Sequence, residues 1–425
     1  MRGLIVGALR WMLNHLEGGS GDKFLTAPDE LLAEIDALLE RTCPTVEAAS
    51  QPPEVGTRRE SVPSDWHMEP GVAVYLRRDG LLKPELEIPA WRTNWSEPTA
   101  KWLKDLAAGP KCADIEHEWG GWRFRVHIQV SHRGIRPLAA VMLRRLPQTL
   151  PPALRLPKEF IEACKSPRGV AIISGGTGSG KSTTLALLVS KYLPQEGLHI
   201  VTYENPIEFR HTSGTNLIRQ YALGADFNTF GEALGEQALR ADPEIIIPAE
   251  LREPEAIRSA LDAADTGHFV VGALHLSTAP TVVSRILNAA GQSYADKLAQ
   301  SLTIVLCQTL VPVKGGGRVA VFEQLVVTPA VRSILALVES RGSAEVAKTL
   351  DAEVASNGVR HGSFTIEHSL AVLIDQGRIT MEAALGYAAR PDVLRTRYND
   401  LLSQARICSA DLGQLYSSKT SKTAS

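Results

Sequence analysis

Four short apolar runs, separated by stretches with helical periodicity, dominate the middle of the chain. They are Val170–Ile173, Ile200–Tyr203, Ile245–Ile247 and Phe269–Leu274. Runs that are apolar at nearly every position are typical of strands buried on both faces, and strands that alternate with helices form parallel sheets. The pattern therefore predicts an α/β core over residues 151–325, and the purely helical periodicity that follows predicts a helical region over residues 326–410.

A different pattern precedes this core. Apolar side chains occupy every second position of Trp122–Val130, which indicates a strand with one buried face. Val72–Leu76 has the composition of another strand, and we expect Pro137–Leu146 to pair with Trp122–Val130. Residues 61–150 are therefore predicted to form a small α+β domain with an antiparallel sheet, joined to the core by a proline-rich hinge at Pro147–Pro157.

The two ends of the chain differ from both domains. Near the start, one helical face carries Leu31, Leu32, Ile35, Leu38 and Leu39. Residues 44–63 have a linker composition, so we expect residues 1–60 to be an appendage with a linker. Residues 411–425 are predicted to be a disordered tail. Met1–Leu13 is apolar but is interrupted by Arg10, so we expect a short helix that packs on the protein, with contact to a membrane surface as the alternative.

Composition narrows the class of function only slightly. The 425 residues carry a formal net charge of -2, so no overall basic field demands nucleic acid. The five cysteines are widely spaced and no two have CxxC spacing, which argues against a zinc ribbon or a disulfide framework. Free thiols in a reducing cytosol are the expected state. No stretch reaches the roughly 20 apolar residues of a membrane-spanning helix.

The strongest chemical signal is a phosphate-binding loop, because GGTGSGKS at Gly175–Ser182 matches GxxxxGK[ST]. It follows one of the apolar strands and opens a predicted helix from Thr183 to Tyr192. Glycines let backbone N–H groups turn towards phosphate oxygens at the positive end of a helix. Lys181 would neutralise the β- and γ-phosphates of ATP, and Ser182 would hold Mg²⁺. The predicted nucleotide-binding residues are Gly175, Gly176, Thr177, Gly178, Ser179, Gly180, Lys181, Ser182 and Thr183.

Acidic and histidine side chains follow three of the predicted strands. Glu250 follows the run that begins at Ile245, where a carboxylate beside the phosphate loop can reach Mg²⁺ or its water. Glu204 and Glu208 follow the preceding strand, where a carboxylate near the γ-phosphate can polarise the attacking water. His275 ends the last strand and could sense the γ-phosphate. Taken singly, each has a structural alternative: a surface glutamate, a solvated turn and a hydrogen-bonded histidine.

Arginines cluster in the small domain, at Arg123, Arg125, Arg133, Arg136, Arg144 and Arg145. A solvated basic face is the usual explanation of such a cluster. The functional interpretation is that some of these side chains reach a nucleotide and stabilise the charge that develops during phosphoryl transfer.

Together these segments resemble the secretion and type IV pilus ATPase superfamily, which includes type II secretion ATPases, pilus extension and retraction motors, and conjugative transfer ATPases. The resemblance runs from about residue 64 to residue 395. The N-terminal-domain signature is matched by Ser64–Pro70 with Arg78–Gly80, and the arginine segments by Arg123–Val126 and Arg144. The Asp box is matched by Tyr203–Glu208, and the Walker B segment by Leu239–Arg252. The His box is matched by Thr266–His275, and the helix and loop after it by Gln308–Pro312 with Gly315–Arg318.

The resemblance implies an α/β fold with a RecA-like P-loop core, a smaller α+β (PAS-like) N-terminal domain and a helical C-terminal region. It implies a cytoplasmic homo-hexamer, peripheral to the inner membrane, that hydrolyses ATP with Mg²⁺ and pushes on an inner-membrane secretion or pilus platform protein without inserting into the membrane. In the roles that it implies, the water activator is Glu204, the Walker B glutamate that holds Mg²⁺ with Ser182 is Glu250, the coupling residue is His275, and the catalytic arginines are Arg123, Arg125 and Arg144.

Some positions depart from the family pattern. Asn205 replaces the usual aspartate of the Asp box, which should spare the reaction because Glu204 remains. Pro248–Ala249 replaces an apolar residue and a glycine, which is expected to alter the strand exit and the Mg²⁺ geometry. The four-cysteine zinc module is absent, as in retraction-type and conjugative members. Because Ala330–Leu335 only partly resembles the retraction-specific helix and residues 1–60 lie outside the retraction pattern, we favour a conjugative or type IVB secretion motor. A type IV pilus retraction or assembly ATPase is the alternative.

Two other classes of function stay open. A RecA-like nucleic-acid translocase needs basic, aromatic-bearing loops that face the nucleic acid. The only candidate stretch is Lys314–Arg318, which is basic but carries no aromatic residue, so nucleic-acid binding is not indicated. A non-catalytic regulatory paralogue is the third hypothesis, and the Pro248–Ala249 departure is the feature that keeps it open.

Overall fold

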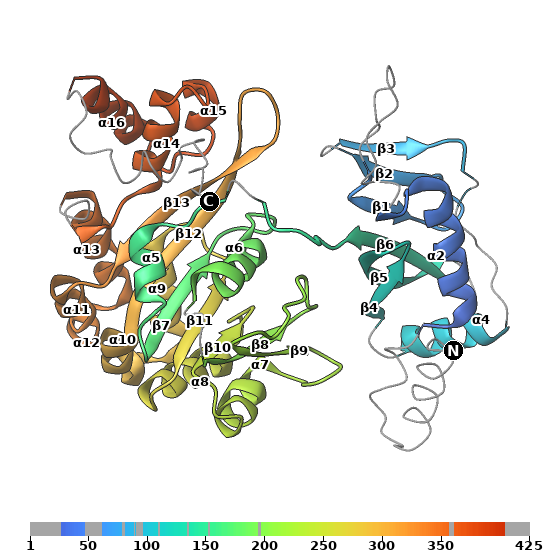
Figure 1. The fold of residues 1–425 in the computed structure, drawn as a ribbon, viewed down its shortest axis with the longest axis horizontal. Coiled ribbons are helices and arrows are strands. Elements are labelled where there is room, and N and C mark those ends of the chain that lie inside the picture. The colour runs from blue at the N-terminus through green and yellow to red at the C-terminus, as the bar shows by residue number, and fades with distance from the viewer. Residues whose placement is uncertain are drawn as a thin grey trace. The chain divides into compact units, whose positions relative to one another are not determined.

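The computed structural model describes residues 27–46, 62–78, 81–88, 90, 97–108, 111–133, 136–151, 154–193, 197–356 and 361–403. It divides the chain into two compact units, residues 1–148 and 149–425 (Figure 1). The predictions for Met1–Leu13, for most of the linker, for the turn at Asp79–Gly80 and for the tail at 411–425 lie outside the described residues.

The first unit is built on a six-stranded antiparallel sheet with the order β3-β2-β1-β6-β5-β4. Its strands are β1 (Asp65–Met68), β2 (Val74–Arg78), β3 (Leu81–Glu85), β4 (Cys112–Trp119), β5 (Trp122–Arg133) and β6 (Arg136–Arg145). Its helices are α2 (Asp29–Thr42) and α4 (Glu97–Ala108). The predicted alternation is confirmed, because Phe124, Val126 and Ile128 of β5 are fully buried and β5 pairs with β6 in antiparallel register.

Helix α2 lies in the stretch predicted to be an appendage, and here the structure differs from the prediction. Leu31, Ile35 and Leu39 are fully buried in the same cluster as Trp66 of the sheet. The indole Nε1 of Trp66 donates to Thr42 Oγ1 at 2.7 Å. The helix therefore belongs to the core of the first unit, because an apolar stripe of this size is unfavourable in water.

The second unit is built on a seven-stranded sheet with the order β13-β12-β7-β11-β10-β8-β9. Its strands are β7 (Gly169–Ser174), β8 (His199–Glu204), β9 (Leu217–Ala222), β10 (Ile245–Pro248), β11 (Phe269–Leu274), β12 (Leu302–Pro312) and β13 (Arg318–Val326). The four predicted strands are confirmed as β7, β8, β10 and β11. Six strands are parallel and β13 runs antiparallel to β12, so the carboxyl ends of β7, β8, β10 and β11 meet at one edge of the sheet.

Two features of this sheet were not predicted. The resemblance implied a helix over Gln308–Pro312, and this is wrong, because these residues end the strand β12. Its residues Ile304, Val305 and Leu306 are fully buried between two helical layers, which favours a strand. Strand β9 was missed because its side chains alternate between exposed and half-buried positions, without a run of apolar residues.

Helices cover both faces of this sheet (Figure 1). The helices that precede residue 302 are α5 (Lys158–Ala163), α6 (Lys181–Leu187), α7 (Phe230–Glu232), α8 (Pro254–Asp265), α9 (Ala279–Ala290) and α10 (Ala295–Ser301). Those that follow the sheet are α11 (Pro329–Leu335), α12 (Val338–Arg341), α13 (Ser343–Ser356), α14 (Ile366–Asp375), α15 (Met381–Leu385) and α16 (Pro391–Ser403). Helices α11–α13 contribute to one core cluster and α14–α16 to the other. None of the described helices is long and apolar enough to cross a bilayer.

Candidate nucleotide-binding site

The phosphate loop joins the interior strand β7 to helix α6, as its sequence predicts. Gly178 and Gly180 have φ angles of 74° and 91°, in a region that side chains other than glycine rarely adopt. Gly180 directly precedes Lys181, the first residue of α6. The tip at Gly176–Gly178 is exposed, whereas Lys181 is only 9% exposed. The loop therefore presents its backbone at the edge of the sheet where the parallel strands end.

Lys181 lies at the centre of the polar contacts of this edge. Its Nζ donates to the carbonyl oxygen of Gly175 at 2.7 Å and to that of Gly176 at 3.2 Å. The Nδ1 atom of His275 lies 3.3 Å away. Burial lowers the pKa of Lys181, and the charges of Glu250 and Glu208 oppose this shift. The ammonium group that the motif assigns to the phosphates thus contacts an imidazole, and the charges of two carboxylates act on it.

A buried glutamine of β12 supports the loop from behind. Gln308 Nε2 donates to the Ser179 carbonyl oxygen at 2.7 Å, and Gln308 Oε1 accepts from Thr184 Oγ1 at 2.6 Å. A Cβ atom on Gly175 would lie 2.2 Å from the Gln308 carbonyl oxygen, and one on Gly180 would lie 2.8 Å from Gln308 Nε2. Gln308 was not among the predicted site residues. The available signal was a lone amide side chain in an otherwise apolar run.

Glu250 and His275 meet at the ends of neighbouring strands. Glu250 Oε1 lies 3.4 Å from His275 Nε2 and 3.0 Å from Arg252 Nε. Burial and the charge of Lys181 lower the pKa of His275, and Glu250 opposes this shift. Both Glu250 and His275 line a pocket of about 160 Å³, to which Arg285 also contributes. The predicted Walker B glutamate and coupling histidine are therefore in contact with each other and, through His275, with Lys181.

The oxygen atoms at this edge are suited to a hard cation such as Mg²⁺. Glu250 Oε1 is buried and has no hydrogen-bond partner among the described residues, although it faces Arg252. Ser182, in the first turn of α6, is half-buried. Carboxylate and hydroxyl oxygens are the ligands that Mg²⁺ takes from proteins, usually together with waters. Glu250 and Ser182 therefore fit the ion that the family implies.

The Pro248–Ala249 departure leaves the strand exit attached to the sheet. Pro248 stays in register with Tyr203 of β8, and the Ala249 N–H donates to the Tyr203 carbonyl oxygen at 2.8 Å. On the other side, the Leu251 N–H donates to the carbonyl oxygen of Ala273 at 2.8 Å. Glu250 is therefore anchored between two neighbouring strands.

The two carboxylates at and after the end of β8, Glu204 and Glu208, have different surroundings. Glu204 Oε1 accepts from Thr202 Oγ1 at 2.6 Å and from Gln220 Nε2 at 2.9 Å. Burial raises the pKa of Glu204, and these hydrogen bonds oppose the shift. Glu208 is half-buried, and its charge acts on both Glu204 and Lys181. The predicted water activator, Glu204, is thus tied to its own strand and to β9, whereas Glu208 is one of the two carboxylates that act on the phosphate-binding lysine.

The three predicted catalytic arginines lie in the first unit and form ion pairs there. The Arg123 side chain lies 2.7 Å from Glu116 Oε1, and Arg125 Nε lies 3.1 Å from Asp114 Oδ1. Arg144 Nε donates to Asp65 Oδ1 at 2.7 Å, with half of the Arg144 side chain exposed. The side chains of Arg133 and Arg136 lie outside the described residues. All three arginines are on the sheet face opposite the apolar core, and their contact with a nucleotide stays a prediction.

Comparison with known proteins adds independent information. The profile of the family described as Type II/IV secretion system protein matches residues 152–316. A twitching motility protein of Neisseria gonorrhoeae is 39% identical over 269 residues, which are 62% of this chain and 68% of that protein. The type IV pilus retraction ATPase PilT of Pseudomonas aeruginosa is 36% identical over 276 residues, which are 64% of this chain and 76% of that protein.

A solved structure agrees with these relatives. The crystal structure of the pilus retraction motor PilT with bound ADP superimposes with a TM-score of 0.65 at 29% sequence identity, over 79% of this chain and 95% of that chain. The likeness covers the RecA-like core and the smaller N-terminal domain that the sequence predicts. The chain belongs to the type II/IV secretion system protein family, within the secretion and type IV pilus ATPase superfamily.

Proposed function

We propose that this protein is an ATP-hydrolysing motor of a type IV pilus system and that it acts in pilus retraction. The sequence pattern alone favours a conjugative or type IVB secretion motor, with pilus retraction or assembly as the alternative. The relatives support the alternative better, because they are named for twitching motility and for pilus retraction. The partial likeness of Ala330–Leu335 to the retraction-specific helix is therefore less informative than the similarity to these relatives over more than 60% of this chain.

The observation that carries the proposal is the arrangement around Lys181, where the phosphate loop, Glu250 and His275 converge. Loop amides and Lys181 would hold the β- and γ-phosphates, which would replace the carbonyl oxygens of Gly175 and Gly176 as partners of the ammonium group. Ser182 and Glu250 would hold Mg²⁺, whose charge neutralises the phosphates when it is bound. Dependence of the activity on Mg²⁺ is part of this proposal.

Two carboxylates compete for the role of water activator, and we propose Glu208 in place of the predicted Glu204. A general base must lie near the phosphates, within reach of the attacking water. Glu204 Oε1 already accepts two side-chain hydrogen bonds. Glu208 acts on Lys181, which supports a position nearer the γ-phosphate. Glu204 would then orient the segment that carries Glu208.

Two further parts of the proposal come from the family. His275 would transmit the state of the γ-phosphate, because it lies between Lys181 and Glu250. Arg123, Arg125 and Arg144 would stabilise charge on the transferred phosphoryl group. A homo-hexamer at the cytoplasmic side of the inner membrane, with a pilus platform protein as the partner, is the proposed assembly.

Paired variants of the two carboxylates test the chemistry. In single-turnover assays with Mg²⁺, Glu208→Gln should bind a fluorescent ATP analogue with affinity close to wild type but lose at least ~100-fold in hydrolysis rate, within the range for a lost general base. Glu204→Gln should lose less than ~10-fold, since it would keep the acceptor for Thr202 and act only through position. The opposite order of rates would restore Glu204 as the water activator.

Deletion of the gene in its host tests the biological role. A retraction motor predicts surface pili that accumulate and do not shorten under the microscope. Loss of DNA transfer with normal pilus dynamics would instead support the conjugative alternative. A nucleic-acid translocase predicts strong, salt-sensitive stimulation of the ATPase by single-stranded DNA, which the retraction proposal does not.

A further inference from the structure

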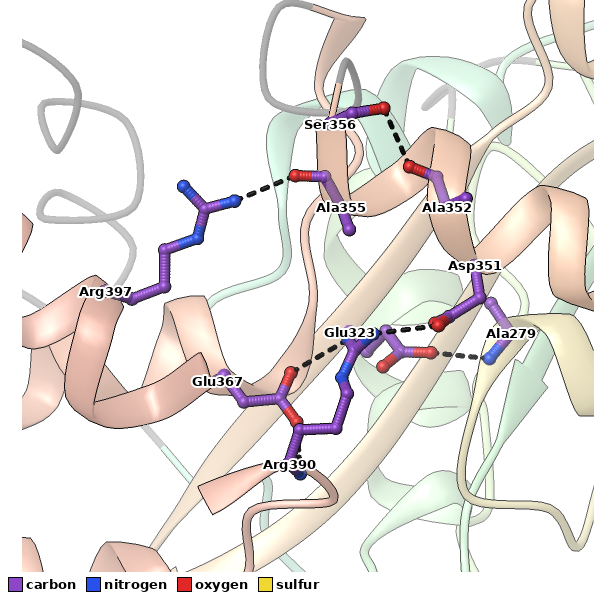
Figure 2. A network of polar contacts seen from close by, with 9 residues as sticks. All are labelled: Ala279, Glu323, Asp351, Ala352, Ala355, Ser356, Glu367, Arg390 and Arg397. Atoms are coloured by element: carbon purple, nitrogen blue, oxygen red, sulfur yellow. Dashed lines mark hydrogen bonds and ion pairs between the residues drawn. The ribbon is translucent and has the colours of Figure 1, made fainter. Parts of the chain in front are cut away.

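A buried carboxylate outside the nucleotide site caps the N-terminus of helix α9, which comes shortly after His275 in the sequence. Glu323 of β13 is 6% exposed, and its Oε1 accepts the backbone N–H of Ala279 at 2.6 Å (Figure 2). Ala279 is the first residue of α9, and the hydroxyl of the preceding Thr278 lies 2.9 Å from Thr281 Oγ1. The first N–H groups of a helix lack partners within the helix. Glu323 thus supplies from another strand the acceptor that a capping side chain usually provides.

The same carboxylate serves a second helix. The backbone N–H of Ile366, the first residue of α14, also acts on Glu323 and lowers its pKa. Thr365, which precedes it, makes no side-chain cap hydrogen bond among the described residues. Two helix N-termini, which each carry partial positive charge, therefore converge on one buried carboxylate. Helix α9 belongs to the sheet-covering layer that precedes β12, and α14 belongs to the helices after the sheet.

The start of α9 is directly connected to the nucleotide site. Strand β11 ends at Leu274, so only His275 and the next three residues separate it from α9. Leu276 is fixed within this segment, because its N–H donates to Ser174 Oγ at 2.9 Å and its carbonyl oxygen accepts from the same hydroxyl at 2.7 Å. The segment that carries His275 is therefore held by the end of β7 at Leu276 and by Glu323 at Ala279.

A second ionic cluster lies in the C-terminal helices near Glu323 (Figure 2). Glu367 of α14 is fully buried, and its carboxylate accepts from the backbone N–H of Arg390 at 2.9 Å and from the Arg390 guanidinium at 3.2 Å. The other guanidinium nitrogen lies 2.8 Å from Asp351 of α13. The charges of Glu367 and Arg390 both act on Glu323. Arg390, which directly precedes α16, therefore joins α13 to α14, and its charge acts on the carboxylate that holds α9.

We propose that Glu323 is a positioning residue for ATP hydrolysis. Glu323 fixes the start of α9 relative to the start of α14, and the position of His275 depends on the start of α9. A movement of the C-terminal helices therefore changes the position of His275 relative to Lys181 and Glu250. The Glu367–Arg390 pair holds α14 in the arrangement that Glu323 requires. This inference rests on the proposed ATPase activity for its kinetic test, but the mechanical link itself can be tested without turnover.

Variants at three positions test the link in the full-length protein. Glu323→Ala removes both helix contacts, and Glu323→Gln keeps a carbonyl acceptor for one of them. Val331→Ala, a 3% exposed residue of α11, is a matched destabilising control. We expect Glu323→Ala to lower kcat at least ~10-fold with less than a ~3-fold change in the Kd of a fluorescent ATP analogue. Glu323→Gln should recover most of the rate, which a loss of folded protein would not allow.

Hydrogen–deuterium exchange supplies the readout that does not depend on turnover. Glu323→Ala should raise exchange at residues 275–282, and Val331→Ala, compared at equal loss of thermal stability, should not. If Glu323→Ala does not fold, Arg390→Gln serves in its place, since Arg390 is one-third exposed and should raise the same exchange and lower kcat ~3-fold or more. Unchanged exchange at 275–282, or an equal loss of kcat in Val331→Ala, would overturn the inference. If the wild-type protein has no ATPase activity but Glu323→Ala still raises exchange at residues 275–282, the proposed function is refuted and the mechanical link stands.

Discussion

Replacement of Gln308 by leucine is the sharpest structural test of the phosphate loop. The side chain is 4% exposed and bridges Ser179 and Thr184, which lie on either side of Lys181. Leucine has a similar size but neither donor nor acceptor, so the substitution removes both contacts with little change in packed volume. The Thr184 hydroxyl, which is fully buried, would lose its acceptor, and the Ser179 carbonyl oxygen would lose its donor.

The size of the effect follows from these contacts. A buried polar group that loses its partner costs about 1–3 kcal/mol, and two such groups would cost about 2–6 kcal/mol if they were independent. They share one side chain and the loop can relax, so we expect a loss near the lower end, about 2–3 kcal/mol. Because the lost contacts shape the loop that we propose binds phosphate, ATP affinity should fall by at least ~10-fold, which corresponds to about 1.4 kcal/mol.

A double-mutant cycle with Thr184→Val measures this directly. Chemical denaturation of the wild type, both single variants and the double variant should give a coupling free energy of about 1–2 kcal/mol between the two positions. Gln292→Leu, at an exposed position of the short helix Gln292–Tyr294, is the matched control and should change neither stability nor ATP affinity. Additive effects of Gln308→Leu and Thr184→Val, or unchanged ATP affinity in Gln308→Leu, would refute the bracing role.

Three further predictions concern backbone fit, titration and the first unit. Gly175→Ala should abolish ATP binding, because the new Cβ atom would lie 2.2 Å from the Gln308 carbonyl oxygen. A Cβ atom at Gly176 would have no other atom within 4 Å, so Gly176→Ala should keep the fold. Calorimetry with and without ATP measures both outcomes. Burial and the nearby charge of Glu367 raise the pKa of Glu323 to about 7, above the ordinary 4.5, so the folded state binds this proton more tightly than the unfolded state. The free energy of unfolding should therefore fall by on the order of 3 kcal/mol as the pH rises from about 4.5 to about 7 and stay level above, and Glu323→Gln should remove this component from denaturation curves. Thr42→Val leaves the buried Trp66 N–H without its acceptor and should lower the stability of the first unit by about 1–3 kcal/mol, measured by tryptophan fluorescence during denaturation.

The parts of the fold that were predictable from sequence are those that local pattern determines. Strands β7, β8, β10 and β11 are buried on both faces, so each leaves an uninterrupted apolar run. The phosphate loop is equally local, since its glycines, lysine and serine are consecutive. The contact of Glu250 with His275 was predictable only through topology, because parallel strands bring their carboxyl ends together.

The parts that were not predictable depend on contacts between distant segments. Gln308 contacts Thr184 across 124 residues, and nothing in the composition of β12 indicates which neighbour its amide meets. The bridge from Glu323 to Ala279 and Ile366 likewise joins three separate elements. The difference between Glu204 and Glu208 depends on Gln220, which lies on the unpredicted strand β9. Helix α2 was recognised as amphipathic, but the sheet that buries it follows the linker and could not be assigned to it from sequence.

The central claim is that ATP is hydrolysed at the phosphate loop. Phosphate release by the purified full-length protein, measured with and without Mg²⁺ under conditions that permit assembly, tests it most directly. We expect Mg²⁺-dependent turnover in the wild type, and no tight ATP binding and no turnover in Lys181→Ala. A wild type without turnover would support the regulatory paralogue, and turnover that survives Lys181→Ala would contradict the assignment of the site.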